Sequence, residues 1–337
     1  AWDSVYPLLV WYLYEYKGDK SLVEKHYPRI KRYVDFLATR SKNGIVDYGL
    51  GDWVPAKTQT GAAITSTAYY FVDAGILSKM AGLLGHAEDE KKYAAVAAGI
   101  KTAFNGRFYQ PATGIYDNGS IAALSCALYQ GLVEPENKAK VLDNLVAEIK
   151  MQNYNMDVGI LGAKYVLNVL ADNGRIDVAY QMLQQRTFPS YGYWVDNGAT
   201  TLWEDWGGKE SLNHIMFGDV SAWFYKYLAG INAASPGFRD IVIKPHVIGD
   251  LTSAKASYES QQGRIVSDWK LDKGVFQLTA IVPANTNATV YVPAEDASKV
   301  NEGGRPIAKS SGVKLLRQEK EYSVFEVASG TYRFSSP

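Results

Sequence analysis

The sequence predicts a mainly α-helical domain over residues 1–230, followed by an antiparallel β-sandwich over residues 231–337. Apolar residues recur at helical spacing through most of the first two thirds of the chain. From Phe238 onward, short β-branched and aromatic runs alternate with turn residues, which is the pattern of strands. The length of 337 residues exceeds the usual size of one domain and also favours two.

The helical pattern falls into separate segments joined by loops of two kinds. Helices are expected at about 3–17, 20–40, 60–85, 87–106, 119–132, 135–151, 157–172, 174–187 and 211–229. Short turns alternate with long, aromatic-rich loops such as 41–59 and 188–210. This alternation is typical of a toroid of helical hairpins that carries its functional residues on the long loops.

The number of predicted helices is odd, and an odd number cannot close a ring of hairpins. We therefore expect an (α/α)6-type toroid that is incomplete at its N-terminus, with further helices encoded upstream of residue 1. Such a chain would expose an apolar seam, which predicts self-association through that seam.

The strand pattern is clearest in the middle of the C-terminal domain. Phe276, Leu278 and Ala280 alternate with Gln277 and Thr279, as in a strand with one buried face. Several such runs without an intervening helix favour an antiparallel sandwich. The segment 230–237, GINAASPG, is predicted to be the hinge between the two domains.

Composition excludes several function classes. Lys+Arg and Asp+Glu balance at 35 each, which gives no support for a nucleic-acid partner. No apolar run is long enough to predict a membrane span. The single cysteine, Cys126, excludes an intrachain disulfide and a Cys-based metal site, and its apolar helical context predicts a buried, inert thiol. We predict no metal and no cofactor.

The segment 189–218 is the strongest functional signal. It holds three of the eight tryptophans, a Trp-Glu-Asp-Trp run at 203–206 and one of four histidines, His214. Sugar rings lie on aromatic faces, and carboxylates supply the proton transfers of glycosidic cleavage. The alternative is a buried aromatic cluster whose polar edges are satisfied internally.

Five stretches resemble one known family. They are GDW at 51–53, PSYGY at 189–193, GATTLWEDW at 198–206, SLNHIMFGDV at 211–220 and LAGI…PGFRDIVIKP at 228–245. Together with the helix-then-sandwich order, they resemble the bacterial α-L-rhamnosidases of the inverting family with an (α/α)6 barrel and a C-terminal β-sandwich. The resemblance implies a glycoside hydrolase that releases terminal α-L-rhamnose from a glycan or glycoside. It favours a bacterial periplasmic or extracellular location, although the sequence itself leaves the compartment open.

The resemblance also assigns roles to single residues. It implies that Glu204, in the Ala-Thr-Thr-x-Trp-Glu motif, is the general base and that His214 lies at the sugar subsite. Further implied substrate contacts are Asp52, Trp53, Trp203, Trp206, Trp2 and Asp3. For Glu204 the alternative is a carboxylate that only accepts backbone hydrogen bonds. For His214 it is a structural histidine, and any single tryptophan can equally belong to the core.

One expected element of the family is absent. The family's general acid lies in an Arg-Asp-Glu-Arg-x-Gly-Trp motif, which this sequence lacks. We therefore expect this chain to be weakly active or inactive alone. Helical toroids also host other glycosidases, unsaturated-uronyl hydrolases and polysaccharide lyases, and a sugar-binding module without turnover is a further alternative.

Overall fold

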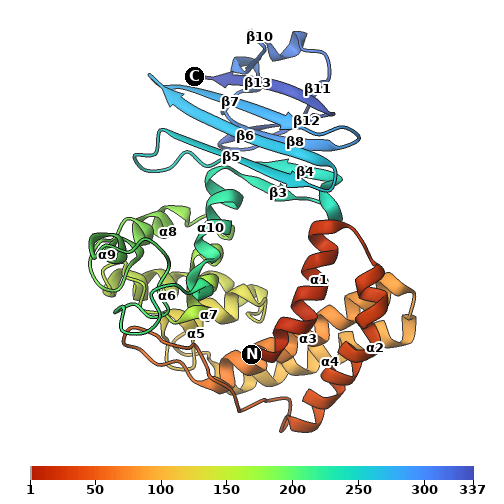
Figure 1. Cartoon of the computed structure of the whole chain (residues 1–337), viewed down its shortest axis with the longest axis vertical. Coiled ribbons are helices and arrows are strands. Elements are labelled where there is room, and N and C mark those ends of the chain that lie inside the picture. Colours follow the sequence, from red (N-terminus) through yellow and green to blue (C-terminus); the bar gives the residue numbers. More distant parts are fainter. Residues whose placement is uncertain (1) are drawn as a thin grey trace. The chain divides into compact units, whose positions relative to one another are not determined.

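A computed structural model describes residues 2–337 and shows a helical part followed by a strand-rich part (Figure 1). Within the described residues the α-helices are α1 (Val5–Lys17), α2 (Ser21–Arg40), α3 (Ala62–Leu84), α4 (Ala87–Phe108), α5 (Ile121–Tyr129), α6 (Lys138–Met151), α7 (Ile160–Asp172), α8 (Ile176–Leu183), α9 (Tyr191–Asp196) and α10 (Asp219–Trp223).

The backbone contacts divide the chain into two compact units. One holds the chain up to Trp11 plus Val23–Val220, and the other holds Tyr12–Leu22 plus Ser221–Pro337.

The helices follow the predicted alternation of short and long connections. Short turns join α1 to α2, α3 to α4 and α7 to α8. Helix α3 ends at Gly85, whose left-handed φ of 79° suits glycine and lets the chain reverse into α4. Long connections follow α2, α4, α6 and α8; the GDW motif lies after α2, whereas the GATTLWEDW motif lies after α9.

Two helical segments differ from the prediction. The segment 188–210 is not all loop, because α9 occupies part of it. The segment predicted as one helix over 211–229 is divided into a 3-10 turn (Ile215–Phe217), α10 and a π-helical turn (Phe224–Leu228). Cys126 is fully buried in α5, as predicted.

The strand-rich unit contains two sheets. The strands are β3 (Ile231–Ala233), β4 (Asp240–Ile243), β5 (Ser253–Ser260), β6 (Gly263–Asp272), β7 (Val275–Val282), β8 (Asn287–Pro293), β9 (Asn301–Glu302), β10 (Arg305–Pro306), β11 (Val313–Gln318), β12 (Tyr322–Val327) and β13 (Gly330–Ser336). One sheet has the order β10-β9-β13-β7-β6-β5 and the other β11-β12-β8-β4-β3. The pairing is antiparallel except between β4 and β8, which run parallel and correct the purely antiparallel prediction.

The two sheets share one hydrophobic core. Trp269, Leu278 and Phe334 from the first sheet pack in the same buried cluster as Ile243 and Phe325 from the second. Strand β7 alternates buried and half-buried positions along its length, which confirms the predicted period of two. The predicted hinge 230–237 contains β3, which pairs with β4 and belongs to the second sheet.

Candidate active site

Two hydrogen-bonded contacts hold the long loops of the helical unit together. The Asp157 carboxylate, in the loop between α6 and α7, accepts the backbone N–H groups of Lys57 and Thr58 at 2.8 and 3.1 Å, and the Thr58 hydroxyl at 2.6 Å. In the same loop the Met156 N–H donates to the Pro189 carbonyl at 2.8 Å. The loops after α2, α6 and α8 therefore meet at one end of the helical unit.

Asp52 of the predicted site caps helix α7. Its side chain is buried, and its two oxygens accept backbone N–H groups at 2.6 to 2.9 Å from Gly159, Leu161 and Gly162. Burial raises the pKa of Asp52 to about 6, although the three N–H donors oppose that shift. These hydrogen bonds use the carboxylate to hold the loop against the start of α7. Direct contact of Asp52 with a sugar stays a prediction.

Trp53 follows Asp52 and is presented at the surface. The Ile160 N–H donates to the Trp53 carbonyl at 3.0 Å, while the indole remains 41% exposed. A Cβ added to Gly159 would lie 2.2 Å from that carbonyl oxygen, so only glycine allows the two segments to approach this closely. The backbone is thus fixed and the ring is free to face a ligand.

The predicted tryptophans Trp203 and Trp206 lie in an aromatic cluster behind the surface. Trp206 is 1% exposed, stacks on Trp194 at 4.8 Å between ring centroids, and donates its indole N–H to the Val158 carbonyl at 2.6 Å. Trp203 is also buried and packs at 5.8 Å from Trp194. Their burial favours the core alternative, and sugar contact by either ring stays a prediction.

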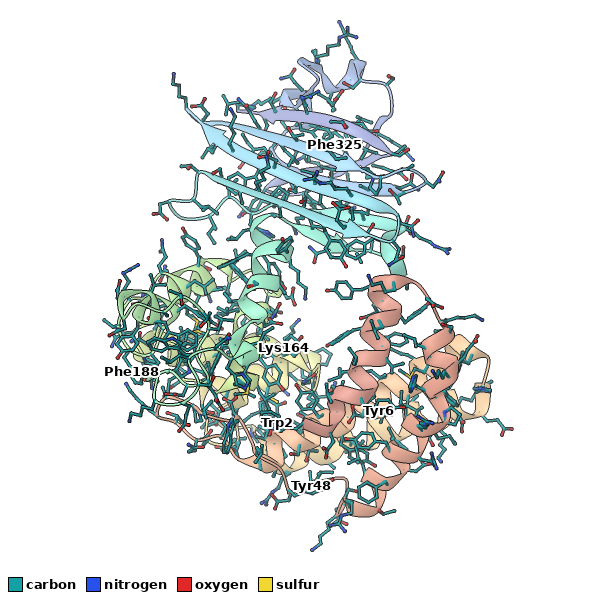
Figure 2. All side chains as sticks on the ribbon, viewed as in Figure 1. Trp2, Tyr6, Tyr48, Lys164, Phe188 and Phe325 are labelled. Atoms are coloured by element: carbon teal, nitrogen blue, oxygen red, sulfur yellow. The ribbon has the colours of Figure 1, made fainter. Side chains whose placement is uncertain are left out.

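A surface cavity of about 470 Å³ nevertheless reaches the edge of this cluster. Trp206 lines it together with Val54 and Phe188, from the loops after α2 and α8, and Tyr193 of α9. Figure 2 marks Phe188 among the densely packed side chains of this region. The size is that of a small-ligand pocket, and its lining combines apolar and polar groups.

Glu204 and His214 lie on one short hairpin. The Glu204 N–H donates to the Ser211 carbonyl and the His214 N–H to the Leu202 carbonyl, both at 2.8 Å. The half-buried Glu204 carboxylate accepts one long hydrogen bond, from the Ser211 N–H at 3.4 Å. A carboxylate offers about four acceptor positions, so most of the capacity of Glu204 is available to a ligand or water.

The neighbouring Asp205 shows the opposite arrangement. Its carboxylate accepts three backbone N–H groups at 2.8 to 2.9 Å, from Gly207, Lys209 and Glu210. These bonds fix the turn that follows Glu204. Of the two adjacent carboxylates, only Glu204 has oxygens that are largely uncommitted.

His214 caps the turn that follows the hairpin. Its Nδ1 accepts the Met216 N–H at 3.2 Å. A nitrogen that accepts an N–H carries no proton, so in the neutral ring the proton lies on Nε2. His214 can therefore donate a hydrogen bond to a sugar hydroxyl from Nε2.

Trp2 and Asp3 lie on a separate turn (Trp2–Ser4) at the start of the described chain, where Figure 2 marks Trp2. The Ser4 hydroxyl anchors this turn by donating to Asp73 of α3 at 2.6 Å. No hydrogen bond among residues 2–337 ties the turn directly to Glu204 or His214. The sugar contacts of Trp2 and Asp3 stay predictions.

Asp73, which no sequence motif singled out, is the buried acceptor that holds this turn. It is fully buried, and within residues 2–337 its second oxygen has no hydrogen-bond partner. Burial raises the pKa of Asp73 to about 7. A carboxyl whose pKa is raised on folding stabilises the protein fully below its unfolded pKa, and this contribution is lost as pH rises through the folded pKa.

We therefore expect Asp73→Asn to flatten the fall in the free energy of unfolding between about pH 4 and pH 8. Asn keeps an acceptor for Ser4 and cannot ionise. Urea unfolding of the helical unit across this pH range measures the effect, with the exposed Asp143→Asn on α6 as the control. An unchanged pH profile for Asp73→Asn would contradict the assignment.

Comparison with known proteins decides the family. The family model of the bacterial alpha-L-rhamnosidase 6 hairpin glycosidase domain matches residues 1–228, and that of the bacterial alpha-L-rhamnosidase C-terminal domain matches residues 230–305. The chain belongs to the bacterial α-L-rhamnosidase family. This confirms the resemblance and the fold class inferred from the motifs.

The relatives of this rhamnosidase-family chain are much longer than it is. An alpha-L-rhamnosidase of Streptomyces avermitilis is 33% identical over 99% of this chain and 33% of its own length. A crystal structure of a Streptomyces avermitilis alpha-L-rhamnosidase complexed with L-rhamnose superposes with a TM-score of 0.91 at 32% identity, covering 97% of this chain and 32% of the other. The alpha-L-rhamnosidase from Dictyoglumus thermophilum gives 0.91 at 36% identity, covering 99% and 39%. The chain spans about a third of the length of the curated relatives it matches.

Two further features of this family member concern metal binding and membranes. Among the described residues no three His, Cys, Asp or Glu side chains are grouped as a metal site would require. None of the helices in residues 2–337 combines the length and the apolar composition needed to cross a bilayer.

Proposed function

We propose that this chain forms part of an enzyme that releases terminal α-L-rhamnose from glycans or glycosides, with Glu204 as the general base. The observation that carries the proposal is the contrast on the 202–214 hairpin. Glu204 is half-buried and accepts one long hydrogen bond, whereas the carboxylate beside it accepts three backbone N–H groups. Membership of the rhamnosidase family and a similar structure complexed with L-rhamnose support rhamnose as the sugar.

The proposed reaction inverts the anomeric centre. Glu204 takes a proton from a water molecule, which attacks the anomeric carbon from the face opposite the leaving group. Inversion needs room for that water, so the general acid should lie about 6.5–9.5 Å from Glu204. The acid motif of the family is absent from this sequence, and we propose that the acid is not supplied by residues 1–337.

Proton NMR of the first sugar released from an aryl α-L-rhamnoside by the complete protein tests this mechanism. We expect the β-anomer to appear first and then to equilibrate. An initial α-anomer would mean retention and would make Glu204 a nucleophile. Binding of rhamnose without any release would support the sugar-binding alternative.

We also propose that this chain, produced alone, self-associates through one face of its N-terminal helix. Trp2, Val5 and Leu9 recur at helical spacing and are 40%, 62% and 54% exposed. Light scattering during gel filtration should show a mass that rises with concentration. Leu9→Glu should abolish that rise, while Leu315→Glu, at an exposed apolar position in β11, should not. A wild-type chain that stays monomeric at all concentrations would contradict self-association through this face.

A further inference from the structure

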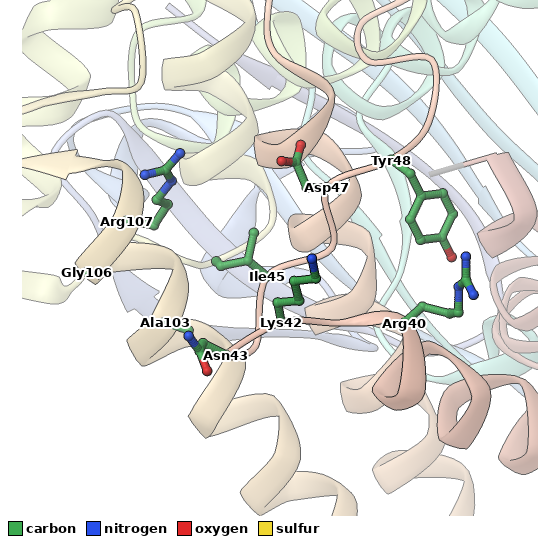
Figure 3. A pocket seen from close by; sticks show the side chains of 9 residues that line it. All are labelled: Arg40, Lys42, Asn43, Ile45, Asp47, Tyr48, Ala103, Gly106 and Arg107. Carbon is green, nitrogen blue, oxygen red and sulfur yellow. The ribbon is translucent and has the colours of Figure 1, made fainter.

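A second cavity, of about 590 Å³, lies beside the same long loop that carries Trp53. It is formed by the end of α2, the loop 42–48 and the last turns of α4 (Figure 3). Its charged lining consists of three cations and one carboxylate, Arg40, Lys42, Arg107 and Asp47. The volume lies within the range of small-ligand sites.

The three cations are not committed to other groups of the protein. Within residues 2–337 Arg40, Lys42 and Arg107 form no ion pair and no side-chain hydrogen bond, whereas Lys31 on the same helix α2 pairs with Asp89 at 2.7 Å. In Figure 3 Arg107 lies on one side of the cavity and Arg40 on the other, with Lys42 between them. Unpaired cations gathered around one hollow attract an anion.

The wall that presents these groups is held rigidly. Lys42 and Ile45 exchange backbone hydrogen bonds at 2.9 and 3.0 Å around a tight turn with positive φ at Asn43 and Gly44. A Cβ on Gly44 would lie 2.8 Å from the Ala103 side chain, so the turn packs closely on α4.

Helix α3 holds the next residues of the wall in the same way. Thr67 exchanges hydrogen bonds with both backbone groups of Val46, at 3.1 and 3.3 Å, and the Ser66 hydroxyl donates to the Tyr48 carbonyl at 2.7 Å. The loop between Lys42 and Tyr48 is therefore organised before any ligand arrives.

The remaining lining groups suit a sugar better than a bare anion. The Tyr48 ring is 41% exposed and offers an apolar face to a pyranose. Asn43 and Asp47 can exchange hydrogen bonds with hydroxyl groups, and the Asp47 carboxylate repels a ligand of high charge density. The guanidinium groups of Arg40 and Arg107 match a planar carboxylate in two-point hydrogen bonding.

We propose that this cavity binds an anionic sugar residue, a uronate above all, of an acidic glycan. The inference rests on the proposed function, since the loop 41–61 joins this cavity to the candidate rhamnose site. It narrows the substrate class to glycans that carry rhamnose together with acidic sugars.

Calorimetric titration of the 337-residue chain with trigalacturonate tests the site directly. We expect saturable binding that weakens as salt is raised to about 0.3 M. The double variant Arg40→Gln/Arg107→Gln should raise the Kd by about tenfold or more. Arg32→Gln, which removes an exposed cation elsewhere on α2, should change the Kd less than about twofold.

Three further ligands show which anionic group the cavity recognises. Methyl-esterified trigalacturonate has the same sugars without charge and should not bind. A sulfated trisaccharide that binds more tightly than the uronate would assign the site to sulfate esters, within the same anionic-glycan class. A single-stranded oligonucleotide that binds as tightly, with the same loss in the double variant, would overturn the proposal in favour of nonspecific polyanion binding.

A second measurement keeps this proposal separate from the rhamnosidase assignment. In the complete protein the double variant should retain wild-type kcat on a neutral aryl rhamnoside and should lose kcat/KM only on an acidic rhamnose-containing oligosaccharide. Equal losses on both substrates would overturn the cavity proposal. If the wild-type protein releases no rhamnose at all, the proposed function fails, while uronate binding is still decided by the titration.

Discussion

Replacing Glu204 by Gln in the complete protein should lower kcat by about 10²–10⁴ and leave rhamnose affinity largely unchanged. The amide is nearly isosteric with the carboxylate, but it cannot accept the proton of the attacking water. Because the Glu204 carboxylate holds only one long hydrogen bond to the backbone, the change should not disturb the hairpin. Single-turnover kinetics and rhamnose titration separate the loss of chemistry from any loss of binding.

The matched control is Glu136→Gln, an exposed carboxylate in the turn between α5 and α6. It should keep wild-type kcat. A Glu204→Gln protein with more than half of the wild-type kcat would exclude Glu204 as the base.

Azide provides an independent test of the geometry. Glu204→Ala leaves space beside the anomeric carbon, and azide can attack there without a base. We expect azide to restore turnover and to give the β-rhamnosyl azide, because it enters from the face that water uses. Formation of the α-azide would place Glu204 on the other face of the sugar.

The helices and strands could be predicted where periodicity was long and regular. Strand β7 and helices such as α2 are examples, since their burial pattern repeats over several turns or residues. Short elements were missed because six residues or fewer carry little periodic signal, as in α9 and β3. The parallel pairing of β4 with β8 could not be predicted, because a strand's composition does not specify its partner.

In the candidate site, too, some residues could be predicted from the sequence and others could not. The motif placed Glu204 and His214 ten residues apart, and a hairpin brings them onto one small element. The helix-capping role of Asp52 depends on amides more than 100 residues away in sequence, so no local pattern could predict it. Asp157 and Gly159 left no local signal, because their partners also lie in a distant loop.

This dependence on distant backbone makes Gly159→Ala a strongly disruptive single-methyl change near the site. The added carbon would lie 2.2 Å from the Trp53 carbonyl oxygen and 2.7 Å from the Asp52 carbonyl carbon. Both obstacles are backbone atoms, which cannot rotate away as the end of a side chain can. Any residue can adopt the φ of −88° found at Gly159. The cost of Gly159→Ala therefore comes from the steric clash and not from backbone strain.

Relief of the clash requires the Asp52–Trp53 segment to move away from α7. That movement breaks the Asp52 cap at Gly159 and the Ile160 to Trp53 hydrogen bond, and it displaces the exposed indole. We expect the free energy of unfolding of the helical unit to fall by about 1–3 kcal/mol. Amide hydrogen exchange at Gly162 and its neighbours should accelerate, because the cap no longer protects them.

The control is Gly75→Ala in the interior of α3, where an added methyl meets no atom within 4 Å. That change should stabilise the same unit by up to about 1 kcal/mol, since alanine favours the helix. In the complete protein Gly159→Ala should also lower kcat/KM for rhamnosides, and Gly75→Ala should leave it unchanged. If Gly159→Ala keeps wild-type stability and exchange, the close contact between the two loops is wrong. If stability falls while kcat/KM holds, the contact stands and Trp53 lies outside the sugar site.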